Sequence, residues 1–237
     1  MTASTAPRAL SSRLPWTHPL FWFAAISLAH VAMRLLASPA LKWDEAEQIL
    51  WTQELALGYG PQPPLYTWLQ WAMNQVFGPS VLALSLLKHG LLALTYSLMY
   101  LAGRELLDER GAFWASASMV LMPALGWYSV RDQTHTILVT AMACGAWWLL
   151  LRIVRRPRPL DFALLGLVCG FGMLAKYSFA LVAGAMLLAA LSVPRRAARC
   201  CRAAGGGRPW WACWSCCRMR HGCCRTSPRR RPAPSAR

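Results

Sequence analysis

The sequence predicts an all-α, polytopic transmembrane protein with about six membrane spans and two interfacial helices in its first external loop. Three observations support this class. The 237 residues are 56% hydrophobic and 14% charged and include 13 Trp, which is too apolar for an ordinary soluble domain. Several runs of about 20 residues carry little or no charge. The arginines gather in clusters between these runs.

The apolar runs predict the spans in order along the chain. Those near the length that crosses a hydrocarbon core as a helix are residues 19–36, 80–103, 111–130 and 134–153. The last run, residues 162–193, is too long for one span and is interrupted by Lys176. We therefore expect two short spans there, joined by a tight turn at 175–178.

The N-terminal segment has two interpretations. Residues 1–18 are basic and polar, and an apolar run after such a segment is also typical of a signal peptide. However, no small-residue cleavage site precedes an obvious soluble domain, and more spans follow. We therefore predict a cytoplasmic N-terminus at 1–18 and an uncleaved first span.

The arginine clusters predict the orientation of the spans. The positive-inside rule makes each cluster cytoplasmic, which puts both ends of the chain inside. Residues 38–79, 129–133 and 175–178 then lie on the outer face. The clusters consist of Arg8, Arg13, Arg104, Arg110, Arg152, Arg155, Arg156, Arg158, Arg195, Arg196 and Arg199.

The first external loop has the pattern of two short helices around a corner. Asp44, Glu47 and Gln48 would share one face of a helix, while the Trp residues around them suit the headgroup level of a bilayer. Glycines and prolines within 58–64 predict a rigid turn. Pro64 can then open a second Trp-rich helix that is too short to span.

This loop places carboxylates over the membrane surface, where a sugar on a polyprenyl phosphate would present its anomeric carbon. An acceptor hydroxyl needs a general base as it attacks, and the leaving phosphate needs cations. The predicted outer face supplies both kinds of group: Asp44, Glu45, Glu47, Glu54, Arg131, Asp132 and Lys176.

Four segments follow the pattern of a known family: "WDEAEQILWTQELALGYGPQPPLYTWL", "LAGRELLDERGAFWASASMVLMP", "RDQTHTILV" and "GLVCGFGMLAKYSFALV". In this order they resemble the first external loop, the second cytoplasmic loop with the third span, an external Asp motif and a lysine hairpin. These are features of the C-type membrane glycosyltransferases of family 39, which include protein O-mannosyltransferases and lipid A aminoarabinose transferases. The resemblance covers about residues 20–193.

The resemblance implies roles for particular residues. Asp44 matches the catalytic base, Glu45 its acidic neighbour, and Asp132 a second external Asp that supports the site. Lys176 matches a lysine near the donor phosphate or its sugar. Gln62 stands where several relatives have a charged phosphate contact, and it can donate a hydrogen bond but brings no charge. Further substrate-binding candidates are Arg34, Arg131 and Tyr66.

Each candidate also has a structural interpretation. Asp44 is a favoured residue for capping a helix N-terminus, and Asp132 could simply pair with its neighbour Arg131. Lys176 could be a turn residue that snorkels to the interface, and so could Lys88 within its span. Intramembrane ionisable groups are nevertheless functional candidates by default.

Residues 194–237 are predicted to form a disordered tail rich in Arg and Cys. Residues 195–237 contain 12 Arg and no acid, whereas 1–194 contain 13 Lys and Arg against 9 acids, so the net charge does not indicate nucleic-acid binding. A zinc site around Cys213 and Cys216 is disfavoured because the spacing is irregular. Arg, Ala, Gly and Pro have GC-rich codons, which suggests a frameshift near 190–200. The chain would then hold only the first half of a longer enzyme, with doubtful activity.

The function implied by the resemblance is transfer of a sugar from a polyprenyl-phosphate donor to a lipid or glycan acceptor, such as lipid A or another cell-envelope glycan. It would occur on the outer face of the bacterial inner (plasma) membrane. No P-loop or dinucleotide motif occurs. We expect no cofactor and no metal site, with a divalent cation left open. The expected partners are donor, acceptor and membrane lipids, without nucleic acid. The alternative is a non-catalytic membrane transport or scaffold protein whose outer acids anchor helices.

Overall fold

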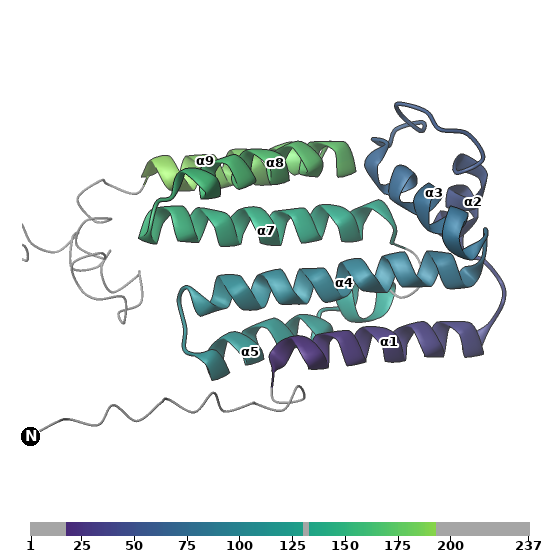
Figure 1. Ribbon diagram of the computed structural model, residues 1–237, viewed down its shortest axis with the longest axis horizontal. Helices are drawn as coiled ribbons and strands as arrows, with labels where there is room; N and C mark the ends of the chain where they lie inside the picture. The colour runs from purple at the N-terminus through teal and green to yellow at the C-terminus, as the bar shows by residue number, and fades with distance from the viewer. Residues whose placement is uncertain (1–17, 130–132, 193–237) are drawn as a thin grey trace, which may run out of the picture.

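The computed structural model describes residues 18–129 and 133–192, which form helices joined by turns (Figure 1). This confirms the all-α class. Within the described residues, three helices are long and apolar enough to cross a membrane: α1 (Pro19–Ala37), α4 (Val81–Arg104) and α7 (His135–Arg155). With 19, 24 and 21 residues, they match the roughly 30 Å of a hydrocarbon core.

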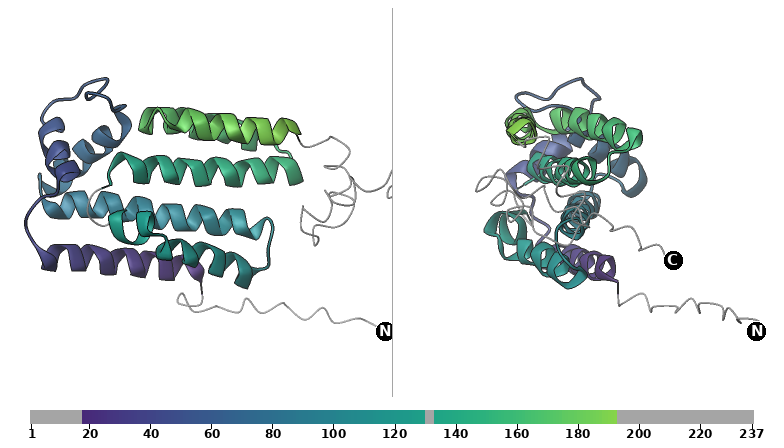
Figure 2. Two further views of the ribbon diagram at one scale, coloured as in Figure 1. Left: turned by 180° about the vertical axis from the view of Figure 1, so that it is seen from behind. Right: turned by 90° about the vertical axis from the view of Figure 1, so that its left-hand side faces the viewer.

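These three helices form the body of a bundle with α4 at its centre (Figures 1 and 2). Helix α4 packs against α1 on one side and α7 on the other, and α7 also packs against α8 (Pro159–Ala175). Aromatic rings fill the contact between α1 and α4. The ring of Phe23 lies 5.9 Å from that of Tyr96 and 6.3 Å from that of Tyr100, measured between centroids.

The run 111–130, which we expected to cross the membrane as one helix, is broken instead, so that prediction is wrong. It forms α5 (Glu109–Ala117), the 3₁₀ turn η2 (Ser118–Leu121) and the π-helical turn η3 (Pro123–Tyr128). Pro123 cannot donate a backbone hydrogen bond, and it disfavours helical geometry at the residue before it. Met122 accordingly has an extended conformation, with φ −72° and ψ 123°.

Helices α8 and α9 (Phe179–Ser192) form the predicted hairpin, and the turn between them lies where Lys176 interrupts the apolar run. Both helices are apolar and shorter than α1, α4 and α7. The turn is closed by backbone hydrogen bonds, including one from Phe179 N to Lys176 O at 3.0 Å. The predicted interruption of the run is therefore confirmed.

The hairpin requires glycine at one position, which gives a testable prediction. A Cβ added to Gly172 would lie 2.6 Å from the ring of Phe179, a fully buried side chain. We expect Gly172→Ala to lower the free energy of unfolding by about 1–3 kcal/mol, because the buried ring has to move. Gly170→Ala is the matched control, since nothing lies within 4 Å of its added Cβ. Unfolding of both variants in detergent measures the difference, and equal stability would contradict the packing argument.

The loop between α1 and α4 forms the two predicted short helices, α2 (Trp43–Trp51) and α3 (Leu65–Phe77), at one end of the bundle (Figure 1). The second helix begins at Leu65, so Pro64 is its N-cap rather than its first residue. The corner between them is rigid. Tyr59 and Gln62 exchange two backbone hydrogen bonds of 3.0 Å, and Gly60 takes the left-handed φ of 56° that favours glycine.

Candidate functional site

Helix α2 is built with its polar side inward. Glu45, Gln48 and Thr52 follow each other at the spacing of one helix face, and all three are buried. Trp43 and Leu50 point outward and are 80% and 65% exposed. This is the reverse of a helix on a soluble protein, and it suits a helix whose outer side meets lipid rather than water.

Glu45 is the centre of a buried charge cluster. Its carboxylate is 2.7 Å from Arg34 Nη2 of α1 and 3.0 Å from Lys88 Nζ of α4. It also accepts a hydrogen bond from the backbone N–H of Lys42, at 3.1 Å. The three charged side chains are at most 6% exposed. Glu45 therefore joins α1, α2 and α4 where they meet.

Glu45 is ionised in this setting. Burial by itself would raise the pKa of its carboxyl group. The hydrogen bond from Arg34 and the positive charge of Lys88 act in the opposite direction, and together with the Lys42 N–H they hold the pKa below its ordinary value. The cluster thus carries two cations around one carboxylate.

Arg34 has other partners besides Glu45. Its guanidinium also donates to the backbone carbonyls of Ser38 and Ala40, which follow the end of α1. Arg34 therefore ties the exit from α1 to the start of α2. These contacts occupy the guanidinium of Arg34, which we predicted as a substrate-binding candidate.

A second polar network joins α2 to α3 and α7. Gln48 accepts a hydrogen bond from Thr67 Oγ1 at 3.1 Å through its side-chain oxygen. Its amide nitrogen lies 3.1 Å from His135 Nε2, and because an amide nitrogen can only donate, the imidazole nitrogen accepts. Thr52 extends the network by accepting from Asn74 Nδ2 at 3.0 Å.

Tyr66 lies between the two networks. Its side chain is fully buried, and its ring centroid is 5.1 Å from that of His135. Burial raises the pKa of Tyr66 above its ordinary value, and the negative charges of Glu45 and Asp44 raise it further. Its hydroxyl has no hydrogen-bond partner among the described residues. Tyr66 is thus a neutral O–H donor close to both carboxylates.

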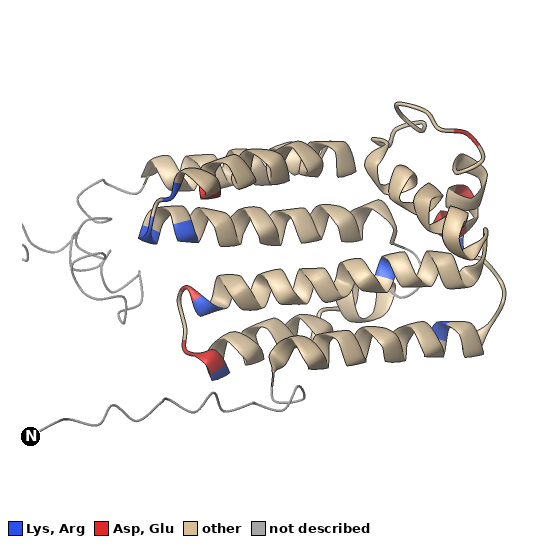
Figure 3. Cartoon of the chain, in the orientation of Figure 1, with Lys and Arg blue, Asp and Glu red and all other residues tan. Residues whose placement is uncertain are grey.

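Asp44 and Lys176 reach the same end of the bundle by different routes. Asp44 is half-buried in the first turn of α2, beside Glu45. Lys176 Nζ donates to Thr136 Oγ1 at 3.0 Å, which fixes it against the first turn of α7, next to His135. Figure 3 shows most of the basic residues gathered at the opposite end, away from α2 and α3.

Several predicted site features lie outside the described residues: Arg131, Asp132, residues 1–17 and the tail with Cys213 and Cys216. Gln62 is half-buried in the corner, where its backbone pairs with Tyr59. Across 18–129 and 133–192, no three His, Cys, Asp or Glu residues come together as a metal site would require.

Sequence reasoning missed how the charges pair. Lys88 was predicted only as an intramembrane candidate or a snorkelling residue, and His135 was not predicted at all. A signal was present in both cases. Charges inside two apolar runs, at Arg34 and Lys88, require a buried acid, and Glu45 lies on the same helix face as Gln48.

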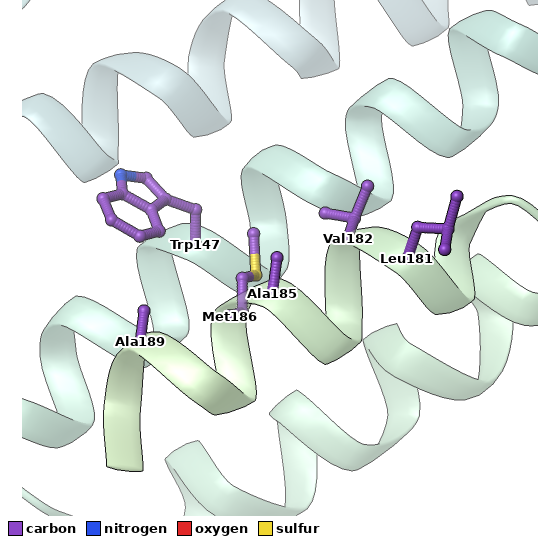
Figure 4. Close-up of a pocket in the computed structure, with 6 residues that line it drawn as sticks. All are labelled: Trp147, Leu181, Val182, Ala185, Met186 and Ala189. Carbon is purple, nitrogen blue, oxygen red and sulfur yellow. The ribbon is translucent and has the colours of Figure 1, made fainter. Parts of the chain in front are cut away.

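An apolar groove of about 460 Å³ lies between α7 and α9 (Figure 4). Trp147 forms one wall, and α9 forms the other. The residues that line it are Trp147, Leu181, Val182, Ala185, Met186 and Ala189. It is a hydrocarbon-lined surface on the side of the bundle.

Comparison with known proteins identifies relatives of this chain. Residues 61–204 match the family model described as dolichyl-phosphate-mannose-protein mannosyltransferase. No solved structure matches. Among curated proteins of Rhizobium johnstonii, the lipopolysaccharide core galacturonosyltransferase RgtB is 39% identical over 173 residues, covering 73% of this chain and 35% of the relative. The lipopolysaccharide core galacturonosyltransferase RgtA of the same organism is 37% identical over 169 residues. That match covers 71% of this chain and 34% of the relative.

The lipid A galacturonosyltransferase RgtD of the same organism is 28% identical over 155 residues, covering 64% of this chain and 32% of the relative. The chain thus spans about a third of the length of the curated relatives that it matches. The matched family segment, in contrast, covers more than half of the chain and contains two of the three long apolar helices. The chain is therefore an integral membrane protein that belongs to the dolichyl-phosphate-mannose-protein mannosyltransferase family, as its resemblance to the C-type glycosyltransferases predicted.

Proposed function

We propose that the complete gene product is a membrane glycosyltransferase that moves a sugar from a polyprenyl-phosphate donor to lipid A or the lipopolysaccharide core. The observation that carries the proposal is the position of Asp44, half-buried beside the ion-paired Glu45 at the end of the bundle that also holds Lys176. The names of the relatives favour a galacturonic acid as the sugar.

In the proposed reaction, Asp44 is the general base. Its carboxylate accepts the proton of the acceptor hydroxyl as that oxygen bonds to the anomeric carbon of the sugar. The bond from this carbon to the phosphate oxygen breaks, and polyprenyl phosphate leaves with the electron pair. Lys176 stabilises the negative charge on the phosphate, and the Tyr66 hydroxyl donates a hydrogen bond to the bound substrate. Gln62, Arg131 and Asp132 complete the proposed site, in which Arg34 and Glu45 hold α2 in place.

We further propose six membrane crossings, with the broken segment 111–130 as one of them and with α2 and α3 on the outer face. The arginines at the opposite end of the bundle support this orientation by the positive-inside rule (Figure 3). The groove between α7 and α9 supports a lipid-linked donor, because its apolar lining suits a prenyl chain. A frameshifted tail at 194–237 is part of the same proposal, which is supported by the chain's spanning about a third of the length of its curated relatives.

The donor class can be tested directly. Membranes that contain the complete gene product are supplied with lipopolysaccharide lacking galacturonic acid and with one of two labelled donors. We expect transfer from polyprenyl-phosphate galacturonic acid and none from the uridine diphosphate sugar. Transfer from the nucleotide sugar in membranes stripped of prenyl lipids would overturn the proposed donor. If the folded protein transfers from neither donor, the transport or scaffold alternative gains support.

A further inference from the structure

A basic pocket lies at the end of the bundle opposite α2 and α3. It has a volume of about 120 Å³ and is lined by Glu105, Arg152, Arg156 and Arg158. Glu105 directly follows α4, and the three arginines come from the last turn of α7 and the turn into α8. The pocket therefore lies where two membrane-crossing helices end.

One wall of this pocket is held rigidly. Arg152 Nη2 is 2.9 Å from Asp161 Oδ1, and the Asp161 carboxylate is 1% exposed. On its other side, the Arg152 guanidinium lies 5.0 Å from the centroid of the Trp148 ring, in a cation–π contact. A buried acid and an aromatic ring thus fix the orientation of a guanidinium that lines the pocket.

The pocket carries an excess of positive charge. Arg152 is balanced by Asp161, and Glu105 lies 3.7 Å from Arg155. Arg156 and Arg158 are exposed and have no ion pair with any described residue. Two guanidinium groups therefore remain for an anion, and guanidinium binds phosphate oxygens with paired hydrogen bonds.

Size and depth narrow the choice of anion. Pockets that enclose a whole small molecule measure about 300–1,000 Å³, so this one has room for a phosphate group and little more. The ends of membrane-crossing helices lie at the level of the lipid headgroups. Basic pockets between such helices bind anionic lipid headgroups. A phosphate whose acyl chains remain in the bilayer fits both constraints.

We propose that this pocket binds the headgroup phosphate of an anionic phospholipid, at a site separate from the proposed sugar-transfer site. The positive-inside rule explains arginines at this end of the bundle, but it does not require a pocket. A diffuse inside-positive charge also gains nothing from a buried acid, whereas Asp161 orients Arg152. The combination of a fixed arginine with two unpaired ones indicates a binding site.

The test measures phosphatidylglycerol binding to the full 237-residue chain in detergent by native mass spectrometry, with phosphatidylcholine as the neutral lipid. We expect the double variant Arg156→Gln/Arg158→Gln to weaken phosphatidylglycerol binding on the order of tenfold or more. Arg156→Lys/Arg158→Lys should weaken it in part, because lysine keeps the charge but loses the paired hydrogen bonds. Arg156 and Arg158 are exposed, and so are the two arginines that the control variant changes, so the fold should be preserved in all of these variants.

The matched control is Arg104→Gln/Arg110→Gln, which removes the same charge at the same end of the bundle but outside the pocket. It should leave phosphatidylglycerol binding within about twofold of the unchanged chain. Equal losses in both double variants would show diffuse attraction and overturn the proposal. Full displacement of the lipid by inorganic phosphate at an equal concentration would identify a free-phosphate site instead, and would also overturn it.

Discussion

Replacing Asp44 by asparagine is expected to lower the rate of sugar transfer by about 10²- to 10⁴-fold, the usual contribution of a general base. Asparagine has nearly the same shape, but its amide cannot accept the proton of the acceptor hydroxyl. Binding of donor and acceptor should change little, so the loss should appear in kcat. The measurement is transfer of labelled sugar by membranes that contain the complete gene product with this one change.

Glu47→Gln is the matched control for this prediction. Glu47 lies one turn further along α2 and is half-buried like Asp44. Its side chain is also a carboxylate, so the two residues carry the same charge. Its replacement should reduce transfer by no more than a few-fold. Undiminished transfer in Asp44→Asn would show that the base is a different residue. Equal losses in both variants would indicate that the negative charge of α2 matters rather than one carboxylate.

The second large effect concerns stability. Glu45→Leu is expected to lower the free energy of unfolding by about 3–5 kcal/mol, the cost of removing one partner from a buried ion pair. Arg34 and Lys88 would be left as two buried cations without the carboxylate that now holds them at 2.7 and 3.0 Å. The change is measured by reversible unfolding of the detergent-solubilised chain as a denaturing detergent is added, which gives the free energy of unfolding of each variant.

Two further variants test whether the effect comes from the buried charges. Glu109→Gln is the exposed control, because Glu109 is 53% exposed and lies 3.7 Å from Arg104. Exposed pairs contribute about 0–1 kcal/mol, so its loss should be small. Adding Lys88→Leu to Glu45→Leu should restore part of the lost stability, since it removes one uncompensated cation. A double variant less stable than Glu45→Leu would contradict the ion-pair explanation.

The same ion pairs predict how acid affects stability. The pKa of Glu45 is lower in the folded protein than its ordinary value of 4.5, so the folded state favours the charged carboxylate. Its stabilising contribution is then fully present above that ordinary value and is lost as the pH falls through the lowered pKa. Glu45→Leu should remove this part of the acid sensitivity.

Local chemistry explains which features could be predicted from the sequence. The apolar runs at α1, α4 and α7 predict helices because a segment surrounded by hydrocarbon must satisfy its own backbone hydrogen bonds. The turn between α8 and α9 was correctly predicted from Lys176, which interrupts the apolar run. The corner between α2 and α3 was correctly predicted from the glycines and prolines within 58–64. The apolar composition of 111–130 is typical of a membrane span, but Pro123 interrupts the helix there.

The sequence by itself determined the membrane class, the helical order and the family, because these depend on composition, run length and motifs read along the chain. Only the tertiary structure decided that Glu45 pairs with Arg34 and Lys88, residues 11 and 43 positions away. It likewise brought Gln48 to His135, 87 positions apart. Such pairings depend on how α1, α4 and α7 pack together, and a buried charge or amide can take any complementary partner that the packing places within reach. Sequence spacing alone does not specify which one that is.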